Sequence, residues 1–332
     1  MPSHINEYDY LHLTARVHSL EGKLLTRERM ARMLDAPTAQ EAARVLTECG
    51  YEEMDLSTAA AMDAALARTR RKIFEDLRKA APDARLVDIF CIRYDYHNAK
   101  VLLKAEAVGR DPDPLLLDGG RYAPMQLKTD YERGDLRRVS EPFRAALTEA
   151  KELLATSGDP QRADLILDRA CFGELTELAQ TVGSAFLSGY VRLLVDSANL
   201  RAAVRAVRMG RDAHFLRATL LPGGDMDTTA LADAALGGDL ASRWAHSPLR
   251  EAAVLGAALL KGGSLTEFER SCDNAISAYV VAARRAPFGE APVIGYLYAR
   301  EAELTAIRVI LTGKLAGLSA DLLRERLRDT YV

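Results

Sequence analysis

This chain has few cysteines, no long apolar run and no large excess of either charge. Each of these features excludes a class of protein. The four cysteines (Cys49, Cys91, Cys171 and Cys272) are far apart and form no Cys-x-x-Cys pair, which is typical of reduced structural thiols in a cytoplasm. No stretch approaches about eighteen consecutive apolar residues, and the N-terminal residues do not read as a signal peptide, so we expect neither a membrane-spanning nor a secreted protein. The formal net charge of −3 gives no signal for binding nucleic acid.

Catalytic and cofactor-binding motifs are also missing. The sequence contains no GxxxxGK[ST], no GxGxxG after a strand, no GxSxG and no HExxH. The six histidines show no pairing at metal-ligand spacing. We therefore predict no cofactor, no metal and no catalytic residue, and expect that the protein is not an enzyme.

What the sequence has in abundance is helix-forming residues. Ala, Leu, Arg and Glu dominate, Gly and Pro gather at a few short breaks, and alternating β-branched runs bounded by turns are absent, so we predict an all-α protein. The expected helices cover residues 6–20, 26–35, 38–49, 57–80, 83–108, 139–156, 160–180, 184–209, 248–260, 265–285, 292–312 and 319–329. Hydroxyl or carboxylate N-caps are expected at Thr26, Asp227, Thr266 and Ser319.

One pattern occurs three times at intervals of about a hundred residues. Residues 95–105 read DYHNAKVLLKA, residues 196–206 read DSANLRAAVRA and residues 303–313 read ELTAIRVILTG. Each copy opens with an acid, and the acids lie 101 and 107 residues apart. Copies of a helical unit bury their apolar faces against one another, so we predict three similar helical units, at about 1–115, 116–220 and 221–332, with approximate threefold symmetry.

The repeated positions carry the candidate structural and binding residues. The acids are Asp95, Asp196 and Glu303, and the first two copies add an amide three residues later, at Asn98 and Asn199. A base stands five residues after every acid, a second base stands nine residues after the first two acids, and the second copy has one more. These bases are Lys100, Lys104, Arg201, Arg205, Arg208 and Arg308. On a helical wheel each acid lies on the apolar stripe, so each requires a polar partner when buried. A three-carboxylate proton or metal site is the alternative.

The bases lie on the opposite side of the same helices. Their spacing fits a solvated outer face paired with local acids, and it also fits contact with an acidic partner. The sequence alone does not decide between these two interpretations, and all six bases are candidates for a partner interface.

Two segments then give a resemblance. YDYHNAKVLLKAE at 94–106 and GYLYAREAELTAIRVILTGKLAGLSADLLRERLRDTYV at 295–332 strongly resemble the C-subunit family of archaeal and bacterial V-type ATPases, whose eukaryotic member is called the d subunit. The stretch at 15–51 is also similar to that family, so the resemblance runs from end to end. Ala306 departs from it, because most relatives are expected to carry Asn there.

The resemblance implies a funnel of three helical subdomains around a pseudo-threefold axis, in a non-catalytic rotor protein of the central stalk. Its partners would be the central shaft subunits and the membrane ring of proteolipid subunits, with no nucleic acid and no direct membrane insertion. The chain would be one monomer within a hetero-oligomeric complex, at the cytoplasmic face of the membrane, and would pass torque between the two motors that couple ATP and ion transport. The alternatives are an α-helical enzyme or scaffold with a buried Asp/Arg cluster; a tetratricopeptide scaffold would need a period near 34 residues.

Overall fold

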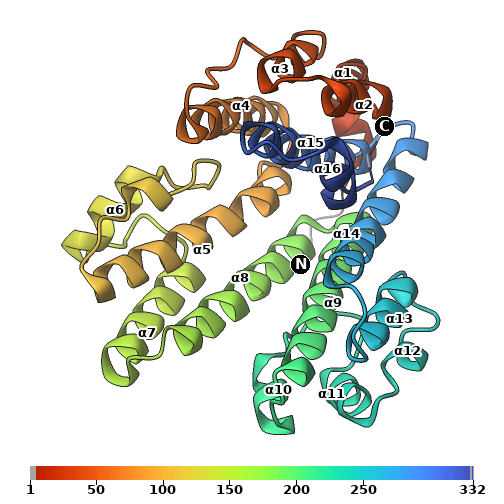
Figure 1. Cartoon of the computed structure of the whole chain (residues 1–332). Helices are drawn as coiled ribbons and strands as arrows, with labels where there is room; N and C mark the ends of the chain where they lie inside the picture. The colour runs from red at the N-terminus through yellow and green to blue at the C-terminus, as the bar shows by residue number, and fades with distance from the viewer. Residues whose placement is uncertain (1–4, 330, 332) are drawn as a thin grey trace. The chain divides into compact units, whose positions relative to one another are not determined.

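The computed structural model describes residues 5–329 and Tyr331, and every regular element in this part of the chain is a helix (Figure 1). The all-α prediction is therefore confirmed. The helices are α1 (Leu11–Glu21), α2 (Arg27–Asp35), α3 (Ala39–Thr47), α4 (Ala59–Ala80), α5 (Arg85–Val108), α6 (Pro124–Arg133), α7 (Glu141–Ser157), α8 (Pro160–Val182), α9 (Ala185–Arg208), α10 (Ala213–Thr219), α11 (Thr228–Gly237), α12 (Leu240–Arg243), α13 (Arg250–Leu259), α14 (Leu265–Val281), α15 (Ala291–Leu315) and α16 (Ala320–Arg326), with short 3-10 turns at Glu7–Tyr10, Asp113–Leu115 and Ala282–Arg285.

The described residues divide into two compact units. Unit 1 holds residues 71–184, and unit 2 holds residues 5–70 together with 185–329 and Tyr331. One boundary falls inside α4 and the other between α8 and α9. The division into three units of about a hundred residues stays a prediction, and within unit 2 the N-terminal residues group with the last part of the chain.

Unit 1 is built around α5 and α8. The ring of Phe143, on α7, is fully buried and forms a T-shaped pair with the Tyr96 ring at a centroid distance of 5.0 Å. Edge-to-face aromatic pairs of this kind contribute beyond the area that they bury, so α5 and α7 are held in a specific register.

Unit 2 contains a core in which α15 and α16 pack with helices from the beginning of the chain. Met33 and Leu46 of α2 and α3 are buried together with Ile307 of α15 and Leu323 of α16. Leu323 approaches Gly313 so closely that a Cβ at Gly313 would lie 2.2 Å from a Leu323 methyl carbon. This apolar contact explains why residues 5–70 belong to unit 2.

Side-chain caps start several helices where a hydroxyl or carboxylate precedes the first turn. Thr26 accepts from the Arg29 amide, Asp227 from Ala230 and Ser319 from Leu322, as the sequence indicates. The expected cap at Thr266 is wrong. Ser264 caps α14 instead, because its hydroxyl accepts from the Glu267 amide and Thr266 already lies in the first turn.

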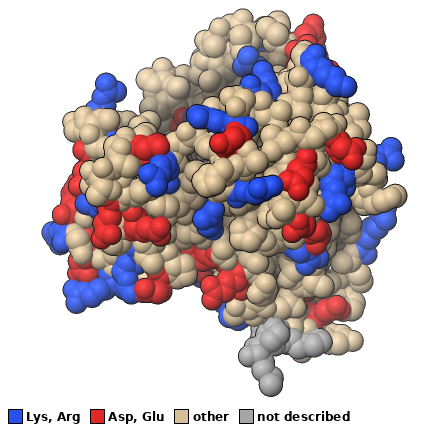
Figure 2. Space-filling model, turned by 90° about the horizontal axis from the view of Figure 1, so that it is seen from below, with Lys and Arg blue, Asp and Glu red and all other residues tan. Residues whose placement is uncertain are grey.

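Charges of both signs alternate closely on one face of the molecule. On the face shown in Figure 2, basic and acidic side chains are interspersed, in keeping with the net charge of −3. A mixed surface of this type gives no long-range attraction to a polyanion.

Candidate functional site

The three repeated acids lie near the middle of three long helices, α5, α9 and α15. Asp95, Asp196 and Glu303 are 0%, 3% and 6% exposed, respectively. A buried carboxylate needs hydrogen-bond donors to stay satisfied. In each helix the donors include the main chain of a loop that leads into another helix.

In unit 2, Asp196 and Asn199 of α9 hold the loop that precedes α11. The carboxylate of Asp196 accepts hydrogen bonds from the main-chain N–H groups of Asp225 (3.1 Å) and Met226 (3.2 Å). The Asn199 side chain accepts from the Leu221 N–H at 2.7 Å and donates to the Leu221 carbonyl at 2.8 Å. Burial raises the pKa of Asp196, and the two N–H groups oppose that shift. Four hydrogen bonds from two side chains thus fix one loop on α9, an arrangement that we call the acid–amide clamp.

The same clamp recurs in unit 1 on α5. Asp95 accepts from the Tyr122 N–H at 3.3 Å, and the Asn98 amide both accepts from the Leu117 N–H (2.8 Å) and donates to the Leu117 carbonyl (2.9 Å). Tyr122 lies five residues after Leu117, as Met226 lies five after Leu221. The acid and the amide therefore grip equivalent loop positions in both repeats.

A glycine in each loop makes the close approach possible. A Cβ added to Gly120 would lie 2.2 Å from Oδ1 of Asp95, and one added to Gly224 would lie 2.1 Å from Oδ1 of Asp196. Both distances are far below van der Waals contact, so any side chain would displace the carboxylate. The second glycine of each Gly-Gly pair is therefore part of the clamp.

Unit 1 adds an arginine that sequence reasoning missed. Arg121 donates from Nε to Asp95 (2.7 Å) and from a terminal nitrogen to Glu174 of α8 (2.7 Å), while the Tyr96 hydroxyl donates to Glu174 at 3.0 Å. Burial raises the pKa of Asp95 to about 6, and the guanidinium of Arg121 limits that rise. The corresponding loop residue in unit 2 is Asp225, so nothing in the repeat itself pointed to Arg121.

The third acid uses a loop from the beginning of the chain. Glu303 of α15 accepts from the main-chain N–H of Leu25 at 2.9 Å, from the Tyr51 hydroxyl and from Arg300 at 2.8 Å. Ala306 stands where the first two copies have an amide, so the Asn part of the clamp is missing here. Leu25 directly precedes the Thr26 cap, as Met226 precedes the Asp227 cap, and the N-terminal loop thus takes the role of the loop before α11.

The bases five residues after each acid pair with an acid on another helix of their own unit. Lys100 lies 2.6 Å from Asp168 of α8; Arg201 lies 2.6 Å from Glu269 and 2.5 Å from Asp273 of α14; Arg308 lies 2.7 Å from Asp63 of α4. Each repeat therefore joins its long helix to an acid of a second helix through the same position.

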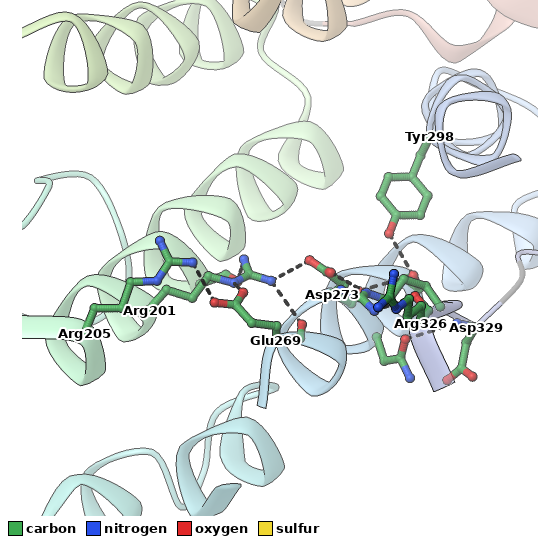
Figure 3. Close-up of polar contacts among 11 residues, drawn as sticks. Arg201, Arg205, Glu269, Asp273, Tyr298, Arg326 and Asp329 are labelled. Atoms are coloured by element: carbon green, nitrogen blue, oxygen red, sulfur yellow. Dashed lines mark hydrogen bonds and ion pairs between the residues drawn. The ribbon is translucent and has the colours of Figure 1, made fainter. Parts of the chain in front are cut away.

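Two of the remaining bases follow the same rule. Lys104 lies 2.7 Å from Asp164, and Arg205 lies 2.6 Å from Glu269, which it shares with Arg201 (Figure 3). Arg208 is exposed in the last turn of α9. Five of the six candidate interface bases thus form ion pairs within their own unit. The partner interface stays a prediction.

Groups that could hold a metal ion or cross a membrane were sought among the described residues. Its residues contain no group of three His, Cys, Asp or Glu side chains that could hold a metal ion, and the four cysteines are buried free thiols. None of the described helices is long and apolar enough to cross a membrane. Asp95, Asp196 and Glu303 each bind a main-chain amide, so their arrangement is that of structural carboxylates.

Comparison with known proteins identifies a family that matches most of this chain. Residues 13–326 match the family described as the ATP synthase (C/AC39) subunit. The C subunit of the V-type sodium ATPase of Enterococcus hirae is 24% identical over 97% of this chain and 99% of its own length. The C subunit of the A-type ATP synthase of Haloquadratum walsbyi is 27% identical over 95% and 96%, and that of the V-type ATP synthase of Thermus thermophilus is 29% identical over 63% and 67%. These matches confirm the resemblance seen in the sequence.

Proposed function

The chain belongs to the family of the ATP synthase (C/AC39) subunit, and on this premise we propose that it is the central-stalk adaptor of a V-type rotary ATPase/ATP synthase. It would link the central shaft to the membrane ring of proteolipid subunits and transmit torque between them. The observation that carries the proposal is the end-to-end match, which covers almost the whole of this chain and of its Enterococcus relative.

The repeated clamps support a mechanical role. A protein that transmits rotation must resist shear between its helices, and each repeat fixes a loop to a long helix through a buried carboxylate and joins that helix to another by an ion pair. Three copies of one device also fit three similar subdomains around a pseudo-threefold axis, which we propose as the architecture that receives the end of the shaft.

The proposed position is peripheral, on the cytoplasmic face of the membrane, within a hetero-oligomeric complex. In this role the chain itself performs no hydrolysis and holds no cofactor, because catalysis belongs to other subunits. Among the six bases, Arg208 is the first one to test at a partner contact, since it is exposed and close to the end of α9.

Reconstitution tests the proposal directly. The membrane ring and the soluble head with its shaft are combined in proteoliposomes with and without this chain, and ATP hydrolysis and ion transport are measured in parallel. We expect hydrolysis in both samples and ion transport only when the chain is present. Ion transport that persists at full rate without the chain rules out the adaptor role.

A pull-down from native membranes provides the complementary test. The tagged chain should retain both the shaft subunits and the proteolipid ring, and the isolated chain should hydrolyse no ATP. Retention of the shaft without the ring, in detergent that preserves the whole complex, would contradict a linking position.

A further inference from the structure

Described residues that follow α16 contact other helices of unit 2. We refer to residues 327–329 together with Tyr331 as the post-α16 segment. Leu327 has φ −77° and ψ 153°, so the helix ends at an extended residue. Leu327 packs against the apolar core of unit 2, and the polar contacts described here lie at two places.

The first contact is with two successive residues of α14. Arg328 donates from Nε to Oδ2 of Asp273 at 2.6 Å, and the main-chain N–H of Asp329 donates to Oδ1 of Asn274 at 3.1 Å. The other carboxylate oxygen of Asp273 accepts from Arg201 of α9 at 2.5 Å (Figure 3). Asp273 therefore joins the repeated ion pair between α9 and α14 to the post-α16 segment.

The second contact is through Tyr331, which is only 5% exposed. Its hydroxyl donates to Glu21 of α1 at 3.2 Å, and its main-chain carbonyl accepts from Arg284 at 3.2 Å. The guanidinium of Arg284 also lies over the tyrosine ring, 5.6 Å from its centroid. Tyr331 is thus buried and hydrogen-bonded through both its hydroxyl and its main-chain carbonyl.

A glycine inside α15 makes room for that tyrosine. A Cβ on Gly295 would lie 2.5 Å from the Tyr331 hydroxyl oxygen and 3.0 Å from Cβ of Ala283. Glycine is unfavourable in a helix interior relative to alanine, so its presence there requires a local reason. The close approach of Tyr331 supplies one.

We propose that the post-α16 segment is a strap that holds α1, α14 and α15 in one arrangement within unit 2. Tyr331 is its fixed end. The pair between Arg328 and Asp273 is its releasable end, because these side chains are 34% and 35% exposed and their attraction is screened by salt. The proposal concerns the isolated chain and holds whether or not the chain acts in a rotary complex.

A double-mutant cycle tests the fixed end. Gly295→Ala is made in the wild-type chain and in Tyr331→Ala, and thermal unfolding of the full chain is followed by circular dichroism. We expect Gly295→Ala to lower Tm clearly in the wild type and by much less when the tyrosine is absent, because the clashing hydroxyl has then been removed. An equal decrease in both backgrounds would show that Tyr331 does not occupy the space at Gly295 in solution, and would overturn the proposal.

Hydrogen exchange tests the releasable end. Arg328→Ala is compared with Arg326→Ala, a matched control two residues away whose side chain is exposed. In Arg328→Ala, and in the wild type at high salt, amides in the C-terminal half of α14 should exchange up to about fivefold faster, while α5 and α8 of unit 1 are unchanged. Equal exchange in the two variants, or faster exchange in Arg326→Ala, would refute a releasable anchor at Asp273.

Discussion

Replacing Gly224 by alanine should break the acid–amide clamp of unit 2 at its tightest point. The added Cβ would lie 2.1 Å from Oδ1 and 2.9 Å from Cγ of Asp196, so either the loop or the carboxylate must move by about 1 Å to reach ordinary contact. That movement loses the hydrogen bonds from the N–H groups of Asp225 and Met226, each made to an ionised and buried acceptor. Hydrogen bonds to charged groups contribute about 1.5–3 kcal/mol each, so partial relaxation leaves a cost of about 3 kcal/mol.

Urea unfolding of the full chain measures this cost, and thermal unfolding should show a Tm lower by about 4 °C. Gly173→Ala is the matched control, because a Cβ at that exposed helical position would meet nothing within 4 Å beyond its chain neighbours and the backbone of its own helix; it should stabilise the chain by about 0.5–1 kcal/mol. Asp196→Ala alone should cost about 2–4 kcal/mol, and Gly224→Ala should add little to it, since the clashing group is gone. A Gly224→Ala variant as stable as the wild type would refute the clamp.

Two further perturbations probe charge in the same repeats. The pKa of Asp95 rises from 3.8 to about 6 on burial, so its contribution to stability is present below about pH 4 and is lost as the pH rises through 6. From pH 4 to pH 7, the free energy of unfolding of Asp95→Asn should therefore rise by about 3 kcal/mol relative to that of the wild type. If the difference between the two unfolding free energies does not change with pH, this prediction is wrong. Arg201→Glu places a third acid beside Glu269 and Asp273 and should cost about 3–5 kcal/mol in urea unfolding, whereas Arg208→Glu should stay within about 0.5 kcal/mol; equal effects would show that the Arg201 pairs do not form.

The sequence was informative wherever one helix carries its own signal. Long apolar stripes placed α5, α9 and α15 within one or two residues at their start, and the same stripes put Asp95, Asp196 and Glu303 on the inner face, where the structure has them. The short helices α6, α10 and α11 were not among the expected ranges. Each has ten residues or fewer, so few turns exist in which a periodic pattern can rise above its surroundings.

Long-range partners were beyond the reach of a helical wheel. The wheel shows that Arg201 lies on the side away from Asp196, but it cannot show that α14 brings Glu269 next to it, 68 residues later. A helical wheel could not identify Arg121 either, because its ion pair with Glu174 depends on the packing of α8 against α5. The six bases could thus be recognised as a repeated feature, while the acids that pair with five of them could be identified only in the three-dimensional structure.

The third repeat shows how the clamp accommodates a different loop. Counting back two residues from the N–H that meets each acid gives Gly120 in the first repeat and Gly224 in the second, but Lys23 in the third. A residue with a Cβ at this position cannot lie as close to the acid as Gly120 and Gly224 do. The third acid is Glu303, which is one methylene longer and accepts from the Leu25 N–H at 2.9 Å. The length of the acid and the size of the loop residue therefore change together, because what each repeat preserves is the hydrogen bond from the loop to a buried carboxylate.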